Sequence, residues 1–289
     1  MTCRSALNRP GGTQSSWTLN PYNGCAHRCT FCYVRTYERR ADRPSDERYG
    51  RTVRVKTNVA EILRRELERP GWRRQDVTVG AATDPYQPAE ARYRLTRRCL
   101  ELLGAFRTPL ALITRSTLVV RDRDVIADAA RGAGAKVHFS ICTLDEDVWR
   151  RTEPGTPPPR QRLRALSLLA AAGIPAGVGI APVLPGLTDG QASLAAVVQA
   201  ARDAGAAHLW WDELRLRPGT REHFLECLAR HWPEQLPRYR RLYAGRSSLP
   251  REEVGALEAR VAEARRPFPL RPPDLIEPSN GAEQLALGL

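Results

Sequence analysis

Short apolar runs recur along the chain and are separated by longer segments in which apolar and polar residues mix. The runs have the length and composition of buried strands, and each begins roughly 30 residues after the previous one. The clearest of them are Val77–Gly80, Leu110–Thr114, Val137–Ile141, Ala176–Ala181 and His208–Trp211. A weaker run at Trp17–Asn20 adds a first strand.

The segments between these runs carry apolar residues at the spacing of an amphipathic helix. In TNVAEILRRELER, an apolar stripe is formed by Val59, Ile62, Leu63 and Leu67. Asn58 stands directly before this stripe, and Glu61 lies three residues after Asn58. We therefore expect a capping box at the start of the helix. The same spacing occurs in TRRCLELLGAF, RDRDVIADAARGAG, RQRLRALSLLAAAG and QASLAAVVQAARDAG.

Strands and helices that alternate in units of about 30 residues predict a parallel sheet. Six such units can be counted, which is fewer than the eight of a closed TIM barrel. The expected fold is therefore α/β, a partial open (β/α)6 barrel of the TIM type, and a doubly wound sheet is the alternative. In both folds, ligands bind at the carboxyl ends of the strands.

The pattern changes after Arg217, where amphipathic helices replace the strand–helix units. We expect an N-terminal extension at 1–16, the partial barrel at 17–217, a C-terminal helical extension at 218–266 and a disordered tail at 267–289. The tail is rich in proline, glycine and polar residues, a composition typical of poorly ordered chain ends.

The charge of the chain is strongly positive. Its 289 residues carry a net charge of +13, nearly all of it from arginine, since Lys56 and Lys136 are the only lysines. Two interpretations stay open. One is a phosphate-rich partner such as nucleic acid. The other is a GC-rich coding bias, which favours arginine codons at positions where any solvated cation would be sufficient.

The sequence favours a cytoplasmic protein without membrane contact. No apolar run approaches the ~20 residues that a membrane span needs. The first residues, MTCRSALNRPGG, lack the apolar core of a secretory signal. In the reducing location that follows, the clustering of the seven cysteines favours a metal site over disulfides.

Three cysteines gather on one predicted loop, just after the first strand. Cys25, Cys29 and Cys32 have the spacing Cys-x3-Cys-x2-Cys, and thiolates bind soft or borderline metals. A structural zinc site would need a fourth ligand. His27 lies between two of the cysteines and is expected to be a solvated loop residue or a neighbour of the metal, while Cys3 lies in an end expected to be poorly ordered.

A four-iron cluster would explain a set of three thiols. Three irons take the thiolates, and the open fourth iron can chelate a small molecule. S-adenosylmethionine (SAM) binds in this way through its amino and carboxylate groups, and one-electron reduction then cleaves it to a carbon radical.

This motif, with the aromatic Phe31 directly before Cys32, resembles the signature of the radical SAM superfamily. Other segments between about Trp17 and Asp189 resemble the branch related to spore photoproduct lyase: NPYNGCAHRCTFCYVR, VRVKTN, TDPYQPAE, YRLTRRCLELL, ITRSTLVVRD, TLDEDVWRRTEP and GIPAGVGIAPVLPGLTD. The resemblance implies a partial (β/α)6 barrel, a [4Fe–4S] cluster held by the three cysteines, and SAM as cofactor.

The resemblance also implies residues that bind SAM. Tyr33 matches a position whose backbone approaches the adenine. Thr83 and Asp84 match the segment that holds the methionine amino group. Ser116 and the cation Arg115 match positions that hold the methionine carboxylate. Relatives usually have lysine in place of Arg115, and an arginine can still pair with a carboxylate.

Further positions concern the nucleoside and the hydrogen donor. Gly177, Gly179 and Ile180 match a strand that packs along the nucleoside. Spore photoproduct lyase carries a hydrogen-donor cysteine where this chain has Ala81, so we do not expect thymine-dimer repair. Cys142, at the end of another strand, is either a donor near the same cavity or a small buried core residue. Cys99 and Cys227 lie on helical apolar stripes and are expected in the core. Trp210 and Trp211, which are adjacent to each other in the sequence, either cover the adenine or pack in the core.

The implied function is a radical SAM iron–sulfur enzyme of the lyase-like branch. It would cleave SAM to a 5′-deoxyadenosyl radical, which takes a hydrogen atom from an unknown substrate. A flavodoxin or ferredoxin is the expected electron donor. Two alternatives remain: an enzyme of this type that modifies or repairs nucleic acid, and a non-catalytic iron–sulfur redox module.

Overall fold

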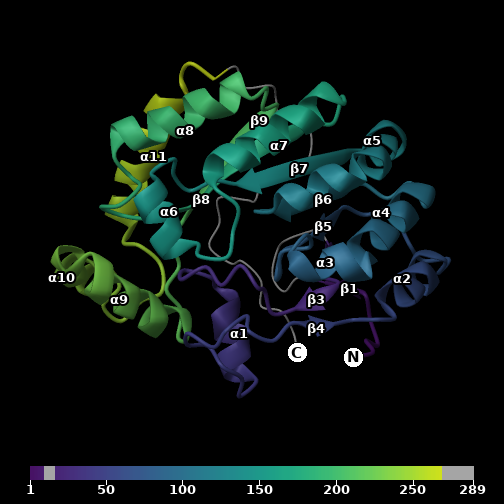
Figure 1. Ribbon diagram of the computed structural model, residues 1–289, viewed down its shortest axis with the longest axis horizontal. Coiled ribbons are helices and arrows are strands. Elements are labelled where there is room, and N and C mark those ends of the chain that lie inside the picture. The colour runs from purple at the N-terminus through teal and green to yellow at the C-terminus, as the bar shows by residue number, and fades with distance from the viewer. Residues whose placement is uncertain (10–16, 269–289) are drawn as a thin grey trace.

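The computed structural model describes residues 1–9 and 17–268, and a seven-stranded sheet forms its centre (Figure 1). The strand order is β1-β2-β5-β6-β7-β8-β9. The strands span Leu7–Asn8 (β1), Trp17–Leu19 (β2), Val77–Val79 (β5), Leu110–Thr114 (β6), Ala135–Ser140 (β7), Ala176–Val183 (β8) and His208–Glu213 (β9).

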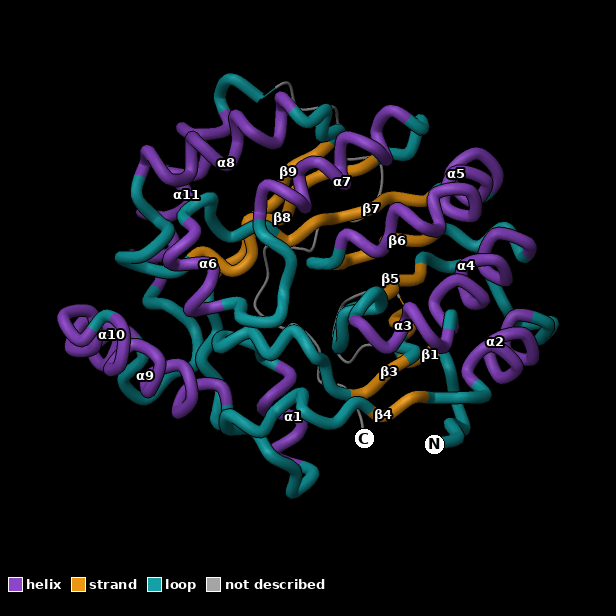
Figure 2. Tube along the Cα trace, in the orientation of Figure 1, coloured by secondary structure: helices purple, strands orange, loops and turns teal. Residues whose placement is uncertain are grey.

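Six of these strands, β2 and β5 to β9, run parallel in chain order, and only β1 pairs antiparallel, at the edge. Helices lie along the outside of the curved sheet (Figure 2). They are α2 (Val59–Leu67), α3 (Pro88–Tyr93), α4 (Leu95–Ala105), α5 (Arg123–Gly132), α6 (Glu146–Thr152), α7 (Pro159–Ala171) and α8 (Gln191–Asp203), with the 3₁₀ helix η1 (Thr117–Asp122) after β6. The expected partial barrel of six β/α units is confirmed, and the doubly wound alternative is wrong.

The two faces of the sheet differ in chemistry, because successive side chains of a strand point to opposite faces. On β7, Val137 and Phe139 are fully buried and join one core with apolar residues of the helices. Lys136, His138 and Ser140 alternate with them and therefore point to the inner side of the partial barrel. Parallel sheets are usually apolar on both faces, so a polar inner face indicates a surface for something other than core packing.

The inner face of β8 and β9 is built from glycines and rings. His208 and Trp210 lean over Gly177 and Gly179, their register partners on β8. Both rings reach His138 on β7: the Trp210 indole donates to His138 Nδ1 at 3.0 Å, and His208 Nε2 lies 2.9 Å from the same nitrogen. The two glycines therefore leave the space in which these rings lie.

Gly179→Ala is expected to destabilise the protein by about 1–3 kcal/mol, because a core that is already filled resists added atoms. A Cβ at this position would lie 2.5 Å from Cζ2 of Trp210, so the ring must move. Urea unfolding measures the change. Gly255→Ala is the matched control: it lies on helix α11 (Arg251–Arg265) with no atom within 4 Å of its Cβ position, and alanine favours a helix. Equal stability of the Gly179→Ala variant and the wild type would contradict this packing.

The N-terminal residues are part of the folded structure. The Glu66 carboxylate accepts hydrogen bonds from the backbone N–H groups of Ala6 and Leu7, which places β1 beside β2. Asn58 occupies the N-cap position of α2, but its side chain bonds to both backbone groups of Cys3 instead of capping the helix. The expected capping box and the expected poorly ordered end around Cys3 are therefore wrong.

The remaining elements lie beside the partial barrel. They are the ribbon of β3 (Tyr22–Asn23) and β4 (Arg54–Val55), α1 (Val34–Arg40), and the C-terminal α9 (Thr220–His231), η2 (Pro233–Gln235), α10 (Leu236–Leu242) and α11, which packs against α8. The expected segment boundaries and the cytoplasmic location stay predictions, and most of the expected tail, from 269 on, lies outside the described residues. Among the residues that the structure covers, no helix could span a membrane.

Candidate iron–sulfur and SAM site

The three cysteines lie on the loop between β3 and α1, beyond the carboxyl end of β2. Cys25 and Cys29 are buried and Cys32 is partly exposed, and all three are free thiols. Two turns shape the loop, with hydrogen bonds from Arg28 N to Cys25 O and from Cys32 N to Cys29 O, both 3.3 Å. Gly24 has a φ of 80°, which an L side chain rarely adopts.

The loop after α6 packs directly on the backbone of the cysteine loop. Thr30 N donates to Thr152 O at 2.8 Å, and Gly155 N donates to His27 O at 3.0 Å. A Cβ at Gly155 would lie 2.4 Å from Ala26 O. The TEPG sequence thus places a glycine where two backbones touch, a contact that spacing along the chain could not reveal.

Thr83 and Asp84, which follow β5, bind the cysteine loop. The Thr83 hydroxyl donates to Gly24 O at 2.7 Å. The Asp84 carboxylate accepts from the Thr114 hydroxyl at 2.8 Å and from the backbone N–H groups of Tyr86 at 2.9 Å and Arg115 at 2.6 Å.

Asp84 also forms an ion pair with His27, whose Nδ1 lies 3.2 Å from Oδ2. Burial alone would lower the pKa of His27, but the Asp84 carboxylate and the Cys25 thiol raise it to about 10. Burial disfavours the Asp84 charge, yet His27 and the hydrogen bonds hold the pKa of Asp84 below its usual value. His27 is only 3% exposed, so the solvated alternative for this residue is wrong and it is a neighbour of the thiols.

Arg115, at the end of β6, lies beside the cysteine loop and Cys142. Its guanidinium carbon is 5.4 Å from the centre of the Phe31 ring, and its Nη2 donates to Ala181 O at 2.8 Å. The Cys142 thiol donates to the same carbonyl at 3.2 Å and lies 3.7 Å from Arg115 Nη2. Burial, followed by the charge of Glu153, raises the pKa of Cys142 to about 12.

Glu153 fixes this arginine and was not found from the sequence. Its carboxylate is 3.2 Å from Arg115 Nε and 2.7 Å from Arg162 Nη1, and the glutamate is 1% exposed. Burial opposes its ionisation, but the two arginines hold the pKa of Glu153 below its usual value. The cluster therefore contains one buried guanidinium group, one partly exposed guanidinium group and one buried carboxylate.

The other expected SAM contacts lie at the same end of the sheet or on its inner face. The Tyr33 hydroxyl donates to Ala81 O, and the Ser116 hydroxyl accepts from Leu118 N at 3.2 Å as the cap of η1. Gly177 and Gly179 lie on the inner face, beneath the His208 and Trp210 rings.

Ile180 and Trp211 lie on the opposite, helix-covered face of the sheet, where they pack in the core. Only the backbone of Ile180 borders the inner face, so any contact of this residue with a nucleoside there would be made by its backbone, and that contact stays a prediction. Cys99 is buried in the core as expected. Cys227 is also buried, and its thiol donates to Arg151 O at 3.7 Å.

The sequence model of the Radical SAM superfamily matches residues 19–196, which include all three cysteines and the strands β5 to β8. The chain belongs to the radical SAM superfamily.

Relatives of this radical SAM protein include an uncharacterised protein of Mycobacterium tuberculosis that is 40% identical over 279 residues, 92% of this chain and 82% of the relative. An uncharacterised protein of the Acidianus two-tailed virus is 28% identical over 224 residues, 73% of this chain and 71% of the relative. Among solved structures, spore photoproduct lyase complexed with dinucleoside spore photoproduct matches with a TM-score of 0.70 at 18% identity, over 93% of this chain and 78% of that one. At this identity, the likeness shows the fold.

Membership of the superfamily implies a [4Fe–4S] cluster and SAM, and the residues present fit both. The donors on the loop are three soft thiols, while His27 is committed to Asp84. Within residues 1–9 and 17–268, no three His, Cys, Asp or Glu side chains converge on a single ion as a zinc site would require. Three free thiols on one loop fit the cluster that the superfamily implies.

Proposed function

We propose that this radical SAM protein is an enzyme of the lyase-like branch, which holds a [4Fe–4S] cluster through Cys25, Cys29 and Cys32 and binds SAM at the open iron. When bound and reduced, the pair supplies a 5′-deoxyadenosyl radical that takes a hydrogen atom from the substrate. The observation that carries the proposal is the loop of three thiols beside Arg115, a partly exposed arginine at the carboxyl end of the sheet.

Arg115 is the proposed partner of the SAM carboxylate. Its guanidinium is held by Glu153 and Ala181 O, so its orientation is set before a ligand arrives. One carboxylate between Arg115 and Arg162 leaves an excess of positive charge in a buried environment. An anionic group next to Arg115 would balance this charge, and arginine suits a carboxylate geometrically.

Thr83 and Asp84 remain proposed partners of the SAM amino group, but each is already engaged. The Thr83 hydroxyl donates to Gly24 O and accepts from Gln87 Nε2 at 2.9 Å. Asp84 accepts three hydrogen bonds and also lies 3.2 Å from His27 Nδ1, the most distant of its four contacts. An ammonium group would therefore replace the His27 contact or add to it, while the backbone contacts keep the carboxylate in place.

Cys142 is the proposed hydrogen donor or radical quencher. A thiol, and not a thiolate, carries the hydrogen atom that such a step needs. Burial raises the pKa of Cys142 to about 12 and thus keeps the proton on sulfur at neutral pH. Its place beside Arg115 puts it near the group proposed to hold SAM.

Formation of 5′-deoxyadenosine tests the proposal. The protein would be reconstituted anaerobically with iron and sulfide, reduced with dithionite and incubated with SAM, and the products separated by chromatography. Release of 5′-deoxyadenosine and methionine is the expected result. A cluster that forms and is reduced but never cleaves SAM would instead favour the redox module. In a separate assay, a flavodoxin or ferredoxin would replace dithionite to test the proposed protein donor.

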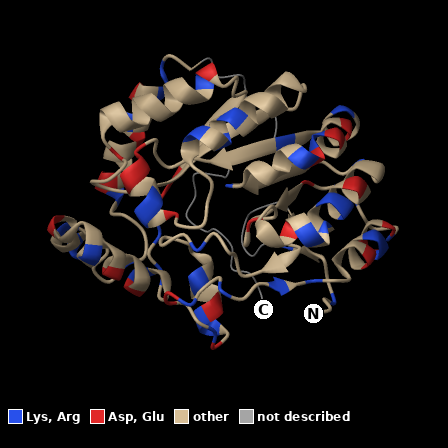
Figure 3. Cartoon of the chain, in the orientation of Figure 1, with Lys and Arg blue, Asp and Glu red and all other residues tan. Residues whose placement is uncertain are grey.

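Nucleic acid is a second candidate substrate. The net charge of +13 favours it, and a solved structure of similar fold holds a dinucleoside spore photoproduct. In the view of Figure 3, basic residues are spread over many elements among acidic ones. Ala81 at the donor position of spore photoproduct lyase argues against the same repair. Binding to DNA or RNA that weakens steeply with salt would support this candidate, and no binding at low salt would remove it.

A further inference from the structure

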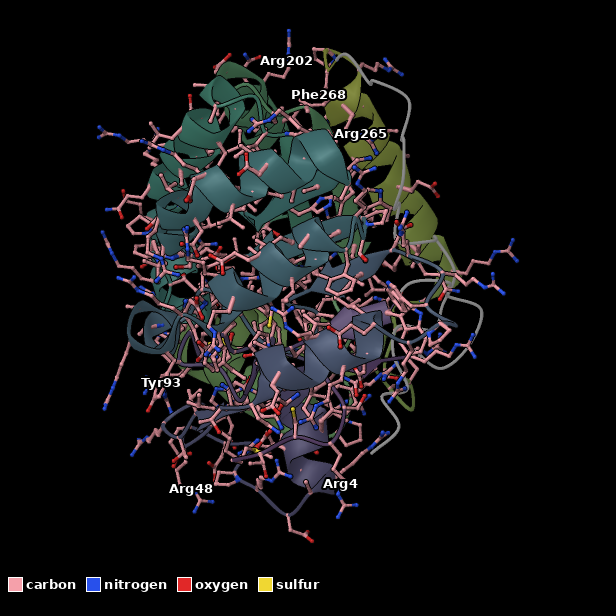
Figure 4. All side chains as sticks on the ribbon, turned by 90° about the vertical axis from the view of Figure 1, so that its right-hand side faces the viewer. Arg4, Arg48, Tyr93, Arg202, Arg265 and Phe268 are labelled. Carbon is pink, nitrogen blue, oxygen red and sulfur yellow. The ribbon has the colours of Figure 1, made fainter. Side chains whose placement is uncertain are left out.

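The Tyr49 side chain reaches from the loop after α1 to the third cysteine. Its hydroxyl oxygen lies 3.4 Å from Cys32 Sγ, and the residue is 2% exposed. Tyr49 packs with Cys25 and Val34 in a small buried cluster of its own. The neighbouring Arg48 points outward at this end of the molecule (Figure 4), so the loop is at the surface while the tyrosine ring points inward.

Arg35 lies against the ring of Tyr49 and fixes its position. The guanidinium carbon is 4.5 Å from the ring centre, and Arg35 is 1% exposed. The guanidinium donates to Cys29 O at 3.2 Å on the cysteine loop, and to Ser45 O at 2.7 Å and Asp46 O at 2.6 Å on the tyrosine loop. One buried cation thus joins the two loops and keeps the hydroxyl next to the sulfur.

The direction of the Tyr49 hydrogen bond follows from the chemistry of the ligand. A cysteine that binds iron is a thiolate, which can only accept. A tyrosine hydroxyl keeps its proton at neutral pH. The phenol therefore donates and the sulfur accepts.

We propose that Tyr49 is a positioning residue that donates a hydrogen bond to the Cys32 thiolate and raises the reduction potential of the cluster. Reduction adds one electron and one negative charge, and a donor or a cation near a ligand sulfur stabilises the more negative state. The electron comes from an external one-electron reductant, and the proton stays on Tyr49. The inference rests on the proposed function, because it needs the cluster on Cys32.

Tyr49→Phe removes the donor and leaves the ring against Arg35. The variant and the wild type would be reconstituted and titrated with dithionite, with the reduced cluster followed by electron paramagnetic resonance. We expect equal iron content and an approximately tenfold lower ratio of reduced to oxidised cluster at a given poise, which corresponds to about 59 mV for one electron. Tyr243→Phe is the matched control: it removes a buried hydroxyl bonded to Leu214 O at 2.7 Å in the C-terminal region, and it should leave the potential unchanged.

The outcomes separate this inference from the proposed function. If the wild type forms no cluster, the function itself fails. If the cluster forms and Tyr49→Phe titrates with the wild-type potential, or shifts no more than Tyr243→Phe, the role of Tyr49 is wrong and the function stands. Tyr49→Met is the second variant, because it fills the space with a flexible apolar chain and also lacks the donor. Its reduction potential should shift in the same direction as that of Tyr49→Phe. An unchanged potential would also count against the role of Tyr49.

Discussion

Cys29→Ala is expected to reduce the iron bound after reconstitution to background and to abolish formation of 5′-deoxyadenosine. Cys29 is the middle cysteine of the loop, and its backbone carbonyl accepts hydrogen bonds from Cys32 N and from Arg35 Nε. Burial raises the pKa of its thiol well above the usual range, so ligation by iron is what would favour the thiolate. The proposed cluster needs three thiolates for three of its four irons, and only two thiols of the loop would remain in this variant. Iron and sulfide assays and the visible absorption of the cluster measure the change.

Cys99→Ala is the matched control for this prediction. Cys99 is fully buried on α4, in the core and away from the loop. Removing its sulfur leaves a small cavity that costs stability but takes away no ligand. The Cys99→Ala variant should bind as much iron as the wild type. If Cys29→Ala retained the full iron content, the ligand assignment and the function built on it would both be wrong.

Glu153→Ala is expected to lower the free energy of unfolding by about 3–5 kcal/mol, because it leaves buried charges without a counterion. The Arg162 side chain is fully buried and the Arg115 side chain is 17% exposed, and both pair with the Glu153 carboxylate. Urea unfolding of the protein without cluster measures the loss. Because Arg115 also loses its orientation, the KM for SAM should rise in whatever fraction remains folded.

Glu146→Ala is the control for Glu153→Ala. Glu146 pairs with Arg150 at 2.6 Å on the surface of α6, with both side chains more than half exposed. Such a pair contributes well under about 1 kcal/mol. Glu153→Gln keeps the shape but removes the charge and should fall between the two. A loss for Glu153→Ala as small as that for Glu146→Ala would show that the buried cluster does not depend on its carboxylate.

The six parallel strands could be predicted because each is a local apolar run. Four of the five clearer runs begin at the observed first residue, and only β7 starts earlier, at Ala135. The sequence predicted a strand at Ala176–Ala181, which ends before Pro182, but β8 continues to Val183. The pairing of β8 with β9 is irregular between Ile180 and Val183, and a proline is tolerated at such a bulge.

The site was predictable where residues adjacent in sequence act together, and not where distant ones meet. The spacing of the three cysteines is local, so the loop was evident. Tyr49 contacts Cys32 and Glu153 contacts Arg115, and no motif spacing in the sequence indicates either pair. The sequence left His27 open between a solvated residue and a neighbour of the metal, because its partner Asp84 lies at the end of another strand. Asn58 was misjudged because the backbone of Cys3 competed successfully for its side chain.

The contacts that shape the cysteine loop have a consequence for the order of assembly. Hydrogen bonds with the side chains of Thr83 and Gln87 and with the backbone of Thr152 and Gly155 hold the loop backbone. Much of the conformational entropy of the loop is therefore lost during folding, and iron meets a preorganised set of thiols. We therefore expect that, unlike small zinc domains, whose apo forms are unfolded, the chain folds first and receives the proposed cluster as a late insertion.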